Sequence, residues 1–431
     1  MSQNSATRPL MSEGRTSVLG AALSMLGPIS LSLYTPAMPA LTEAFATTDA
    51  AIKLSLSFYF GGFAFAMLAT GPLSDAFGRR RTVVWFLALY LLGSILAAFA
   101  GSVSMLLAGR LIQGIGASVG LTVGRAIVRD QFTGEPASRI LNMLGIMLAV
   151  GPAIAPTFGG IILYLIGWKA IFVAMIGFGL TLGALVLLLM EETGKPDRAK
   201  ARPLPLLKAY GRLLRSQHFM ASSLVIATST GSLYALASIL PFVMINLAGL
   251  TPSQFGIGML MQTGCYFSGS VVFRILLRWF TSKAQVAFGL SFVGIGAVAL
   301  AISTEVLPIS YLSVMLPVGC FAFGIAFLIP YITNAALLPF PDIAGSASAM
   351  MGFMQMGSGL VTGMIAALLG SPILAMQIMV PAMGAIAVAC YLWLRLIETR
   401  EPATPEIREP AEPPAAGDDW NKDPQRSAAI K

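Results

Sequence analysis

The sequence predicts an all-α membrane protein with twelve transmembrane helices arranged as two halves of six. Of its 431 residues, 56% are hydrophobic and only 11% are charged, whereas a soluble globular domain carries about 25% charged residues. The mean hydropathy is +0.80. Such a chain cannot cover itself with polar surface, so its surroundings must be lipid. A hydrocarbon core of ~30 Å needs about 20 mostly apolar residues per helix, and the chain contains twelve such stretches.

The twelve stretches follow one another with short connections, except in the middle of the chain. Because backbone groups in lipid must be hydrogen-bonded within their own segment, each stretch is expected to be a helix. The longest hydrophilic interruption, from Glu191 to His218, divides them six and six. The expected spans are 17–39, 53–73, 82–100, 103–125, 139–164, 168–190, 219–246, 253–277, 284–303, 307–335, 344–368 and 372–397.

This division defines five predicted regions. A cytoplasmic N-terminal tail is expected at 1–16, a first six-helix bundle at 17–190 and a cytoplasmic central loop at 191–218. A second six-helix bundle follows at 219–397. The remaining residues, 398–431, are rich in Pro, Glu and Ala and are expected to form a disordered cytoplasmic tail.

Lysine and arginine residues predict the orientation in the membrane. If the N-terminus is cytoplasmic, only Lys53 and Lys169 fall outside and Arg110 falls within a span, while all other basic residues face the cytoplasm. We therefore expect a multi-pass protein of the plasma (bacterial inner) membrane with both termini cytoplasmic. The net charge of +8 then reflects topology and contact with anionic lipid, and no nucleic-acid partner is expected.

No metal or other cofactor is expected. Cys265, Cys320 and Cys390 lie in apolar runs without metal-ligand spacing, and the single histidine, His218, cannot form a cluster. Such cysteines usually pack in the protein interior as small hydrophobic residues.

The stretch GPLSDAFGRRR at 71–81 places an acid, a glycine and three arginines at a cytoplasmic helix end. Asp75 could cap a neighbouring helix while the arginines hold carbonyls or acids, which would make a latch that breaks and re-forms. A basic membrane anchor with an incidental aspartate explains the spacing equally well. The candidate latch residues are Gly71, Asp75, Gly78, Arg79 and Arg80.

The fourth span contains an arginine, Arg110, one turn before Gln113 and Gly114. An arginine within a span costs at least ~2.5 kcal/mol and normally faces a cavity or a partner. It cannot lose its proton in a protein, so Arg110 could attract or repel a charged group without carrying a proton. A structural arginine that bonds helix carbonyls is the alternative. Farther along, Gly116, Gly120 and Gly124 form a face that permits close helix contact.

The fifth span contains GPAIAPTFGG at 151–160, in which two prolines and three glycines interrupt an apolar run. Membrane helices tolerate such residues because neighbours satisfy the freed backbone groups. Gly151, Ala155 and Gly159 form one smooth row, and Pro152, Pro156 and Gly160 form a row beside it that is expected to bend the helix. Such a helix could seal against the other half and slide, although a kink that serves only packing is also compatible.

Together these stretches resemble the major facilitator superfamily. The loop at 71–81 is similar to its GxLxDxxGRR signature, the fourth span to its RxxxG signature, and 151–160 to the motif of its proton-coupled exporters. The Bcr/CflA-like drug-resistance branch is closer still. The stretches that resemble this branch are GPxxAPxxGG, RAIVRD at 125–130, TPAMPAL at 35–41 and AGSASAMMGF at 344–353.

The resemblance implies a twelve-helix major-facilitator fold and a secondary active transporter. It would export small amphipathic drugs or metabolites by proton antiport with alternating access. Two departures bear on this. Ala76 stands where the family has a basic residue, which weakens the latch, and Ser30–Pro36 lacks the acid common in this branch. No acid lies deep in any span, so Asp130 or another carboxylate at the rim is the candidate proton carrier.

The substrate is expected at the midplane between the halves. An arginine without a buried acid favours neutral or anionic substrates over organic cations. The candidate pocket residues are Tyr34, Tyr234, Gln262, Asn334 and Gln355, with Arg110, Gln113 and Asp130 along the pathway.

An uncoupled or import-type transporter of a small neutral or anionic metabolite remains the alternative function. The sequence shows no phosphate-binding GxxxxGK[ST] loop, HExxH or GxSxG, so neither an ATP-driven pump nor an enzyme is expected. The expected partners are a small-molecule substrate, protons and membrane lipid, and the expected state is a monomer.

Overall fold

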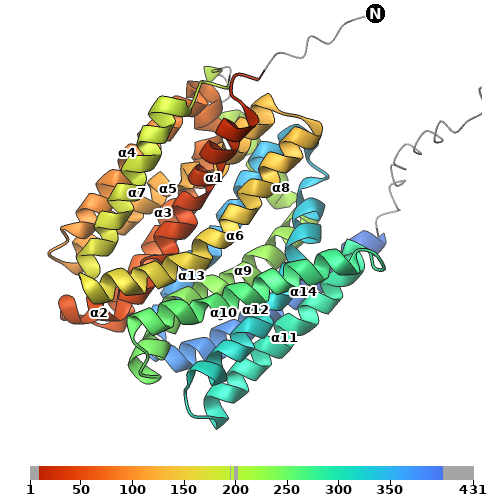
Figure 1. Cartoon of the computed structure of the whole chain (residues 1–431). Coiled ribbons are helices and arrows are strands. Elements are labelled where there is room, and N and C mark those ends of the chain that lie inside the picture. The colour runs from red at the N-terminus through yellow and green to blue at the C-terminus, as the bar shows by residue number, and fades with distance from the viewer. Residues whose placement is uncertain (1–8, 195, 199–201, 401–431) are drawn as a thin grey trace, which may run out of the picture.

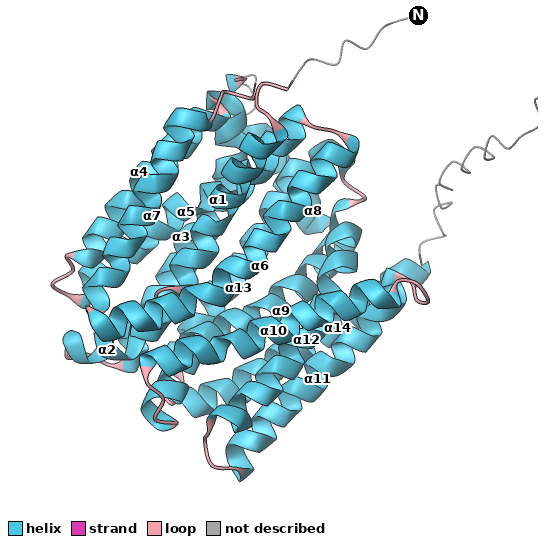
Figure 2. Cartoon of the chain, viewed as in Figure 1, coloured by secondary structure: helices cyan, strands magenta, loops and turns pink. Residues whose placement is uncertain are grey.

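The structure is a computed structural model that describes residues 9–194, 196–198 and 202–400. In these ranges every regular element is a helix (Figure 2), which confirms the all-α prediction. The expected tail at 398–431 lies outside the described residues apart from 398–400, as do residues 1–8 of the expected N-terminal tail.

The first half runs from α1 to α7. Its first span has three parts, because Pro36 and Pro39 each stand in the first turn of a new helical segment. Proline is tolerated there because the N–H groups of a first turn have no hydrogen-bond partner within the helix. The elements are α1 (Glu13–Ser32), the 3-10 helix η1 (Thr35–Ala37), α2 (Met38–Ala44), α3 (Asp49–Phe77), α4 (Arg79–Ala98), α5 (Val103–Gln131), α6 (Gly134–Leu165) and α7 (Trp168–Leu189).

The second half runs from α9 to α14. Its first span changes to a π-helix, η3, directly after Pro241, the last residue of α9. The elements are α9 (Gln217–Pro241), η3 (Phe242–Leu247), α10 (Pro252–Leu276), α11 (Ser282–Val306), α12 (Tyr311–Leu337), the short 3-10 helix η4 (Pro341–Ile343), α13 (Ala344–Leu368) and α14 (Pro372–Arg400).

Eleven helical segments of the described chain are long and apolar enough to cross a membrane. The twelfth expected span, α10, is 25 residues long but falls outside this group. Its sequence explains the difference, since Gln254, Gln262, Thr263, Ser268 and Ser270 interrupt its apolar residues. It packs along α6 and α12, which cover part of its surface. The twelve-helix architecture is therefore confirmed.

One helix was not predicted. The central loop contains α8 (Pro203–Arg215), which begins at a proline in its first turn and buries Tyr210 and Leu213. Apolar residues at helical spacing, Leu206, Tyr210 and Leu213, could have indicated it.

The beginning of the first membrane helix, α1, and the end of the last, α14, lie on the same side of the molecule (Figure 1). We call the end that carries the beginning of α1, α8 and the end of α14 the terminal face, and the opposite end, with α2 and the beginning of α10, the distal face. The two halves meet along two seams, in which α3 packs against α13 and α6 packs against α10.

The glycines of the fourth span allow close packing, as expected, but toward two neighbours. A Cβ at Gly120 would lie 2.1 Å from the Leu23 carbonyl oxygen on α1, and one at Gly116 would lie 2.3 Å from the Tyr90 amide nitrogen on α4. Any side chain would push these backbones apart. The glycines therefore place α5 at the centre of the first half.

Candidate functional site

A cluster of charged side chains at the terminal face joins three helices of the first half and the segment that follows α7. Arg79 at the start of α4 donates from Nε to Asp130 Oδ2 of α5 at 2.9 Å, from Nη1 to Ser74 Oγ at 2.6 Å, and it also pairs with Asp75 at the end of α3. The Arg79 side chain is only 7% exposed. Hydrogen bonds between ionised partners are roughly twice as strong as those between neutral groups. We call Asp75, Arg79, Asp130 and Glu192 the Arg79 cluster.

Glu192, just after α7, is a member of this cluster that was not predicted from the sequence. Its carboxylate accepts hydrogen bonds from the backbone N–H groups of Arg79 at 2.6 Å and Arg80 at 3.2 Å. A carboxylate at this place caps the α4 N-terminus and matches its dipole. Asp75, the expected cap, instead holds the Arg79 guanidinium. The known preference for acidic residues near helix N-termini predicts that an acid caps α4, but it does not predict which acid.

The remaining latch residues have distinct places. Gly78 separates α3 from α4 with φ of +100°, a conformation that favours glycine, and a Cβ there would lie 2.4 Å from Glu192 Oε2. Arg80 donates to the Leu187 carbonyl at 2.6 Å. Gly71 faces Thr122 at an ordinary contact distance, since a Cβ at Gly71 would lie 3.7 Å from Thr122 Cγ2. All of these contacts lie within the first half.

A second charged site surrounds Arg110 in the middle of α5. The guanidinium carbon lies 4.4 Å from the centroid of the Tyr34 ring and 4.3 Å from that of the Tyr59 ring. Arg110 donates from Nη1 to Gln113 Oε1, and Gln113 donates in turn to Ser94 Oγ at 2.8 Å. The side chain has no exposed surface. The turn between α1 and η1, which carries Tyr34, and the helices α3 and α5 thus enclose one cation between two aromatic faces.

No carboxylate neutralises this cation among the described residues. Two of its groups, Nε and Nη2, are buried without a hydrogen-bond partner. Each such orphaned group costs on the order of 1–3 kcal/mol, more for a charged one, and the two stacked rings return about 2 kcal/mol or more each where water is excluded. Removing the guanidinium charge from water costs roughly several kcal/mol more, so the site holds this charge at a free-energy cost.

The surroundings of Arg110 change the interpretation of two predicted residues. Tyr34 was expected to line the substrate pocket, but it is fully buried inside the first half, where its hydroxyl lies 2.5 Å from Ser55 Oγ. Asp130 was expected on the same pathway as Arg110. It lies about 30 Å farther along α5, within the Arg79 cluster. Tyr59, on α3, was not singled out from the sequence.

The seam between α6 and α10 is a reciprocal contact of two similar sequences. Pro156-Thr-Phe-Gly-Gly160 on α6 faces Pro252-Ser-Gln-Phe-Gly256 on α10. A Cβ at Gly160 would lie 2.3 Å from the Pro252 carbonyl oxygen, and one at Gly256 would lie 2.3 Å from that of Pro156. The hydroxyl after each proline donates to the opposite glycine, Thr157 to Gly256 at 3.1 Å and Ser253 to Gly160 at 3.3 Å. We call this contact the proline–glycine clasp.

The two rows of the fifth span face different neighbours. The smooth row of Gly151 and Gly159 packs closely against the first span, with Gly159 close to the Leu33 carbonyl and Gly151 close to Ile29. The second row, which includes Pro156 and Gly160, makes the contact between the halves. Pro152 lies within the continuous helix α6.

The other seam joins α3 and α13 through aromatic and small residues. A Cβ at Gly359 would lie 2.8 Å from the Phe60 ring, and one at Gly363 would lie 2.2 Å from Ser57 Oγ. The Phe60 ring also stacks against Tyr234 of α9, with 4.7 Å between centroids. The contact of Ser57 with Gly363 closes this seam near the distal face, and the seam continues past mid-depth, where a Cβ at Gly352 would lie 2.3 Å from Met67 Cε.

Three of the four predicted pocket residues of the second half lie at mid-depth of their helices. Tyr234, Gln262 and Gln355 lie near the middle of α9, α10 and α13 and are half-buried, and Gln262 Oε1 is buried without a partner. Asn334 was expected with them, but it lies three residues before the end of α12 at the terminal face and is exposed.

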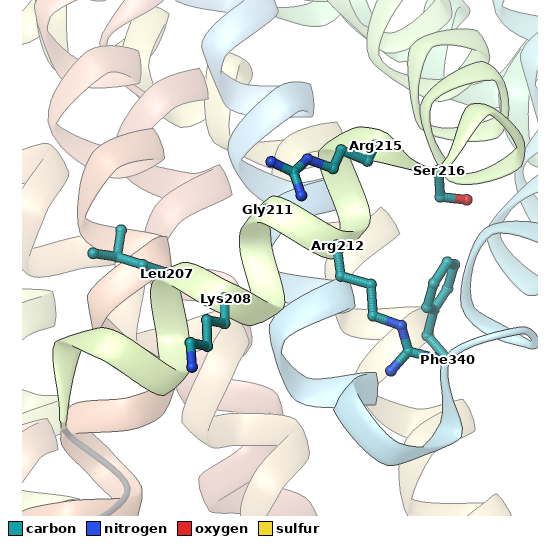
Figure 3. A pocket seen from close by; sticks show the side chains of 7 residues that line it. All are labelled: Leu207, Lys208, Gly211, Arg212, Arg215, Ser216 and Phe340. Carbon is teal, nitrogen blue, oxygen red and sulfur yellow. The ribbon is translucent and has the colours of Figure 1, made fainter.

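A surface pocket of about 650 Å³ lies beside α8 at the terminal face (Figure 3). One lining residue, Arg212, pairs with Asp342 of η4 at 2.5 Å. On its other side α8 binds the first half, since the Tyr210 hydroxyl donates to the Leu68 carbonyl of α3 at 2.7 Å. Burial raises the pKa of Tyr210 to about 12, so this hydroxyl keeps its proton. The residues that line the pocket are Leu207, Lys208, Gly211, Arg212, Arg215, Ser216 and Phe340.

Two six-helix halves that meet along seams, with buried polar groups between membrane-spanning helices, define a membrane transporter. Residues 20–363 match the sequence profile of the Major Facilitator Superfamily, and the chain belongs to this family. Its members are transporters, not enzymes.

Individual relatives agree with this assignment. The uncharacterized MFS-type transporter YdgK of Bacillus subtilis is 30% identical over 78% of this chain and 84% of its own. The chloramphenicol resistance protein of Pseudomonas aeruginosa is 30% identical over 80% of this chain and 82% of its own. The solved structure of a D-xylose-proton symporter superposes with a TM-score of 0.68 over 88% of this chain and 97% of its own, at 13% identity, which shows the shared fold.

Proposed function

We propose that this protein exports small amphipathic drugs or metabolites by alternating access, in exchange for protons. The observation that carries the proposal is the closure of both seams toward the distal face, through the clasp and through Ser57 and Gly363. A transporter that alternates must open this face and close the terminal one. The similarity to a chloramphenicol resistance protein and the resemblance to the Bcr/CflA-like branch favour drugs as cargo.

In this proposal the terminal face is cytoplasmic and the membrane is the bacterial inner membrane. The basic residues of α8 and of the Arg79 cluster lie at this face, as the positive-inside rule requires. The protein works as a monomer, with one pathway between its own halves. The Arg79 cluster holds α3, α4 and α5 in one arrangement while the terminal face is open, and it rearranges when that face closes.

The cargo binds between the halves beside Tyr234, Gln262 and Gln355. The orphaned Gln262 carbonyl oxygen needs a donor, which a neutral amphipathic molecule or water can supply. With a buried arginine and no carboxylate nearby, neutral or anionic cargo is favoured over permanent organic cations.

An uncoupled or import-type transporter is the second candidate function. The observation in its favour is that Arg110 has no carboxylate partner among the described residues. A carboxylate in a low-dielectric cavity is the simplest proton carrier, and a chain without one could move its substrate down a gradient alone.

Transport by purified protein in liposomes distinguishes the two. Vesicles with a pH-sensitive dye inside receive chloramphenicol as a neutral probe, an anionic drug or a quaternary ammonium drug, with and without a pH gradient. Drug-dependent proton flux supports antiport. Drug counterflow without proton flux supports the uncoupled function, and no counterflow of any drug contradicts export of this class.

Asp130→Asn is expected to lower the initial rate of counterflow by about tenfold or more. The substitution removes one charge-assisted hydrogen bond, which stabilises one conformation of the cycle by about 1.5–3 kcal/mol. Asp75→Asn should cost less, because the Asp75 side chain is 35% exposed and that of Asp130 is 18% exposed. Glu135→Gln, an exposed acid in the first turn of α6, is the matched control. Equal rates for Asp130→Asn and this control would show that the Arg79 cluster does not act in the cycle.

A further inference from the structure

Lys53 lies in the closed seam of the distal face, although the sequence pattern placed it among the residues outside the membrane. It lies one turn into α3 and has no exposed surface. Its Nζ donates to the Gly370 carbonyl, in the turn between α13 and α14, at 3.3 Å. The same nitrogen lies 5.4 Å from the centroid of the Phe242 ring, at the start of η3. One cation of the first half is therefore enclosed by two segments of the second.

The second half offers this lysine no charge. The segments that cover it, 242–251 and 359–377, contain no acidic or basic residue. On its own helix, Asp49 precedes it by one turn, which favours the ammonium form. The other charged residues at the distal face are Glu43 on α2, Lys169 on α7 and Glu305 on α11. No ion pair of Lys53 with any carboxylate occurs among the described residues.

We propose that the Lys53 amine is a proton-binding site linked to the opening of the distal face. A lysine in water keeps its proton up to about pH 10. When the seam closes, the amine leaves water for a carbonyl and an aromatic ring, and a burial of this kind disfavours the charged form. The neutral amine can still donate to the Gly370 carbonyl. The open state therefore binds the proton more tightly than the closed state.

The direction of the linkage follows from this difference. Because the open state binds more protons, lowering the pH on the distal side favours opening, and raising it favours closure. One linked proton changes the open-to-closed ratio by at most about tenfold per pH unit. The inference rests on the proposed alternating access. It supplies the transport cycle with a titratable group, which matters because no acid lies deep in any span.

Distance measurements between spin labels test this without any drug. Cysteines at Gly101 and Leu307, exposed on distal connections of the two halves, carry the labels, and the three native cysteines are replaced. Distances are recorded from about pH 6 to pH 10, which brackets the titration of a lysine whose proton is held less tightly on burial, in the full-length protein in lipid nanodiscs. We expect a longer-distance population in the unsubstituted background that shrinks as the pH rises.

Three variants identify the group that titrates. Lys53→Met keeps the length of the side chain without the charge and should stay closed at every pH. Lys53→Arg keeps the charge throughout and should stay open across the range. Lys169→Met, at an exposed lysine of the same face, should titrate like the parent. If Lys53→Met does not fold, Lys53→Gln replaces it.

Two outcomes would overturn the inference. One is a pH dependence that persists in Lys53→Met, and the other is a parent protein whose distances do not change with pH. Failure of the proposed export is a separate result, because it would be seen as absent drug counterflow in liposomes whether or not the distal face responds to pH.

Discussion

Gly256→Ala is expected to shift the protein toward the distally open state and to reduce transport at least about tenfold. The added Cβ would lie 2.3 Å from the Pro156 carbonyl oxygen and 2.8 Å from Thr157 Cα. These are backbone atoms of a helix, so they cannot turn away, and the halves must separate. Overpacking of this kind costs about 1–3 kcal/mol, and about 2 kcal/mol changes a two-state ratio roughly thirtyfold.

The structure provides matched controls for this substitution. Gly264, two turns farther along α10, and Gly145, on α6, have no atom within 4 Å of an added Cβ. Gly264→Ala and Gly145→Ala carry the same increase in helix propensity without the clash. Both should transport like the parent protein, so a defect confined to the clasp glycines would exclude a general effect of alanine.

Gly160→Ala should resemble Gly256→Ala, since its Cβ would lie 2.3 Å from the Pro252 carbonyl oxygen. Once one alanine has separated the helices, the second finds more room. The double substitution should therefore cost less than the sum of the two, a coupling that a double-mutant cycle detects. Independent, additive effects would mean that the two contacts do not act as one clasp.

The accessibility of Ser57→Cys measures the opening directly. Ser57 is buried in the other seam, against Gly363, and a membrane-impermeant maleimide can reach it only when the distal face opens. At constant pH, labelling should be faster in Gly256→Ala than in Gly264→Ala. Equal labelling rates would contradict a role of the clasp in closing this face.

Hydropathy was enough to predict the twelve helices, and the long hydrophilic interruption their division into two sets of six. Each of the twelve spans has its own apolar signal, and only α10 is weakened by its polar residues. The helix α8 was missed because it is short and lies in a hydrophilic loop, where amphipathic spacing is the only signal. The breaks in the first span follow from Pro36 and Pro39, which the sequence shows but whose effect depends on tertiary packing.

The candidate site was predictable where one segment carries the whole pattern. Asp75 and Arg79 lie within five residues and pair with each other, as an acid close to arginines suggested, although the expected helix cap comes from elsewhere. Partners from distant segments were not predictable, such as Glu192 at the α4 N-terminus or Tyr59 over Arg110. The clasp lies between these cases. Its Pro-[Ser/Thr]-x-x-Gly pattern occurs once in each half, but only the structure shows that the two copies face each other.

Arg110→Met is expected to abolish most transport while leaving the protein as stable as the parent or more stable. Methionine fills a similar volume between the Tyr34 and Tyr59 rings. It removes a buried cation whose Nε and Nη2 lack partners, and replacing a buried charge by a well-packed apolar side chain is often neutral or stabilising by about 1–4 kcal/mol. The stacking on two rings is lost, as is the hydrogen bond to Gln113.

The loss of transport has a separate cause. With the distal face closed, burying Arg110 costs free energy. A conformation that brings water or a polar group of the cargo to Nε and Nη2 lowers this cost and is favoured by the free energy saved. Methionine has no charge to bury, so it stabilises the conformation in which the distal face is closed. The free-energy difference that favours opening of this face therefore becomes smaller. We expect an initial counterflow rate at least about tenfold lower, which corresponds to about 1.4 kcal/mol.

Two measurements on the same samples separate the roles of Arg110. Thermal stability is followed by the fraction that remains monodisperse after heating, and transport by drug counterflow in liposomes. Arg110→Ala should lose both, because it leaves a cavity between the rings. Arg110→Lys retains the charge but loses the planar stacking, and should transport poorly. Normal counterflow in Arg110→Met would make Arg110 a purely structural residue, and a large loss of stability would show that its contacts outweigh the cost of burying the charge.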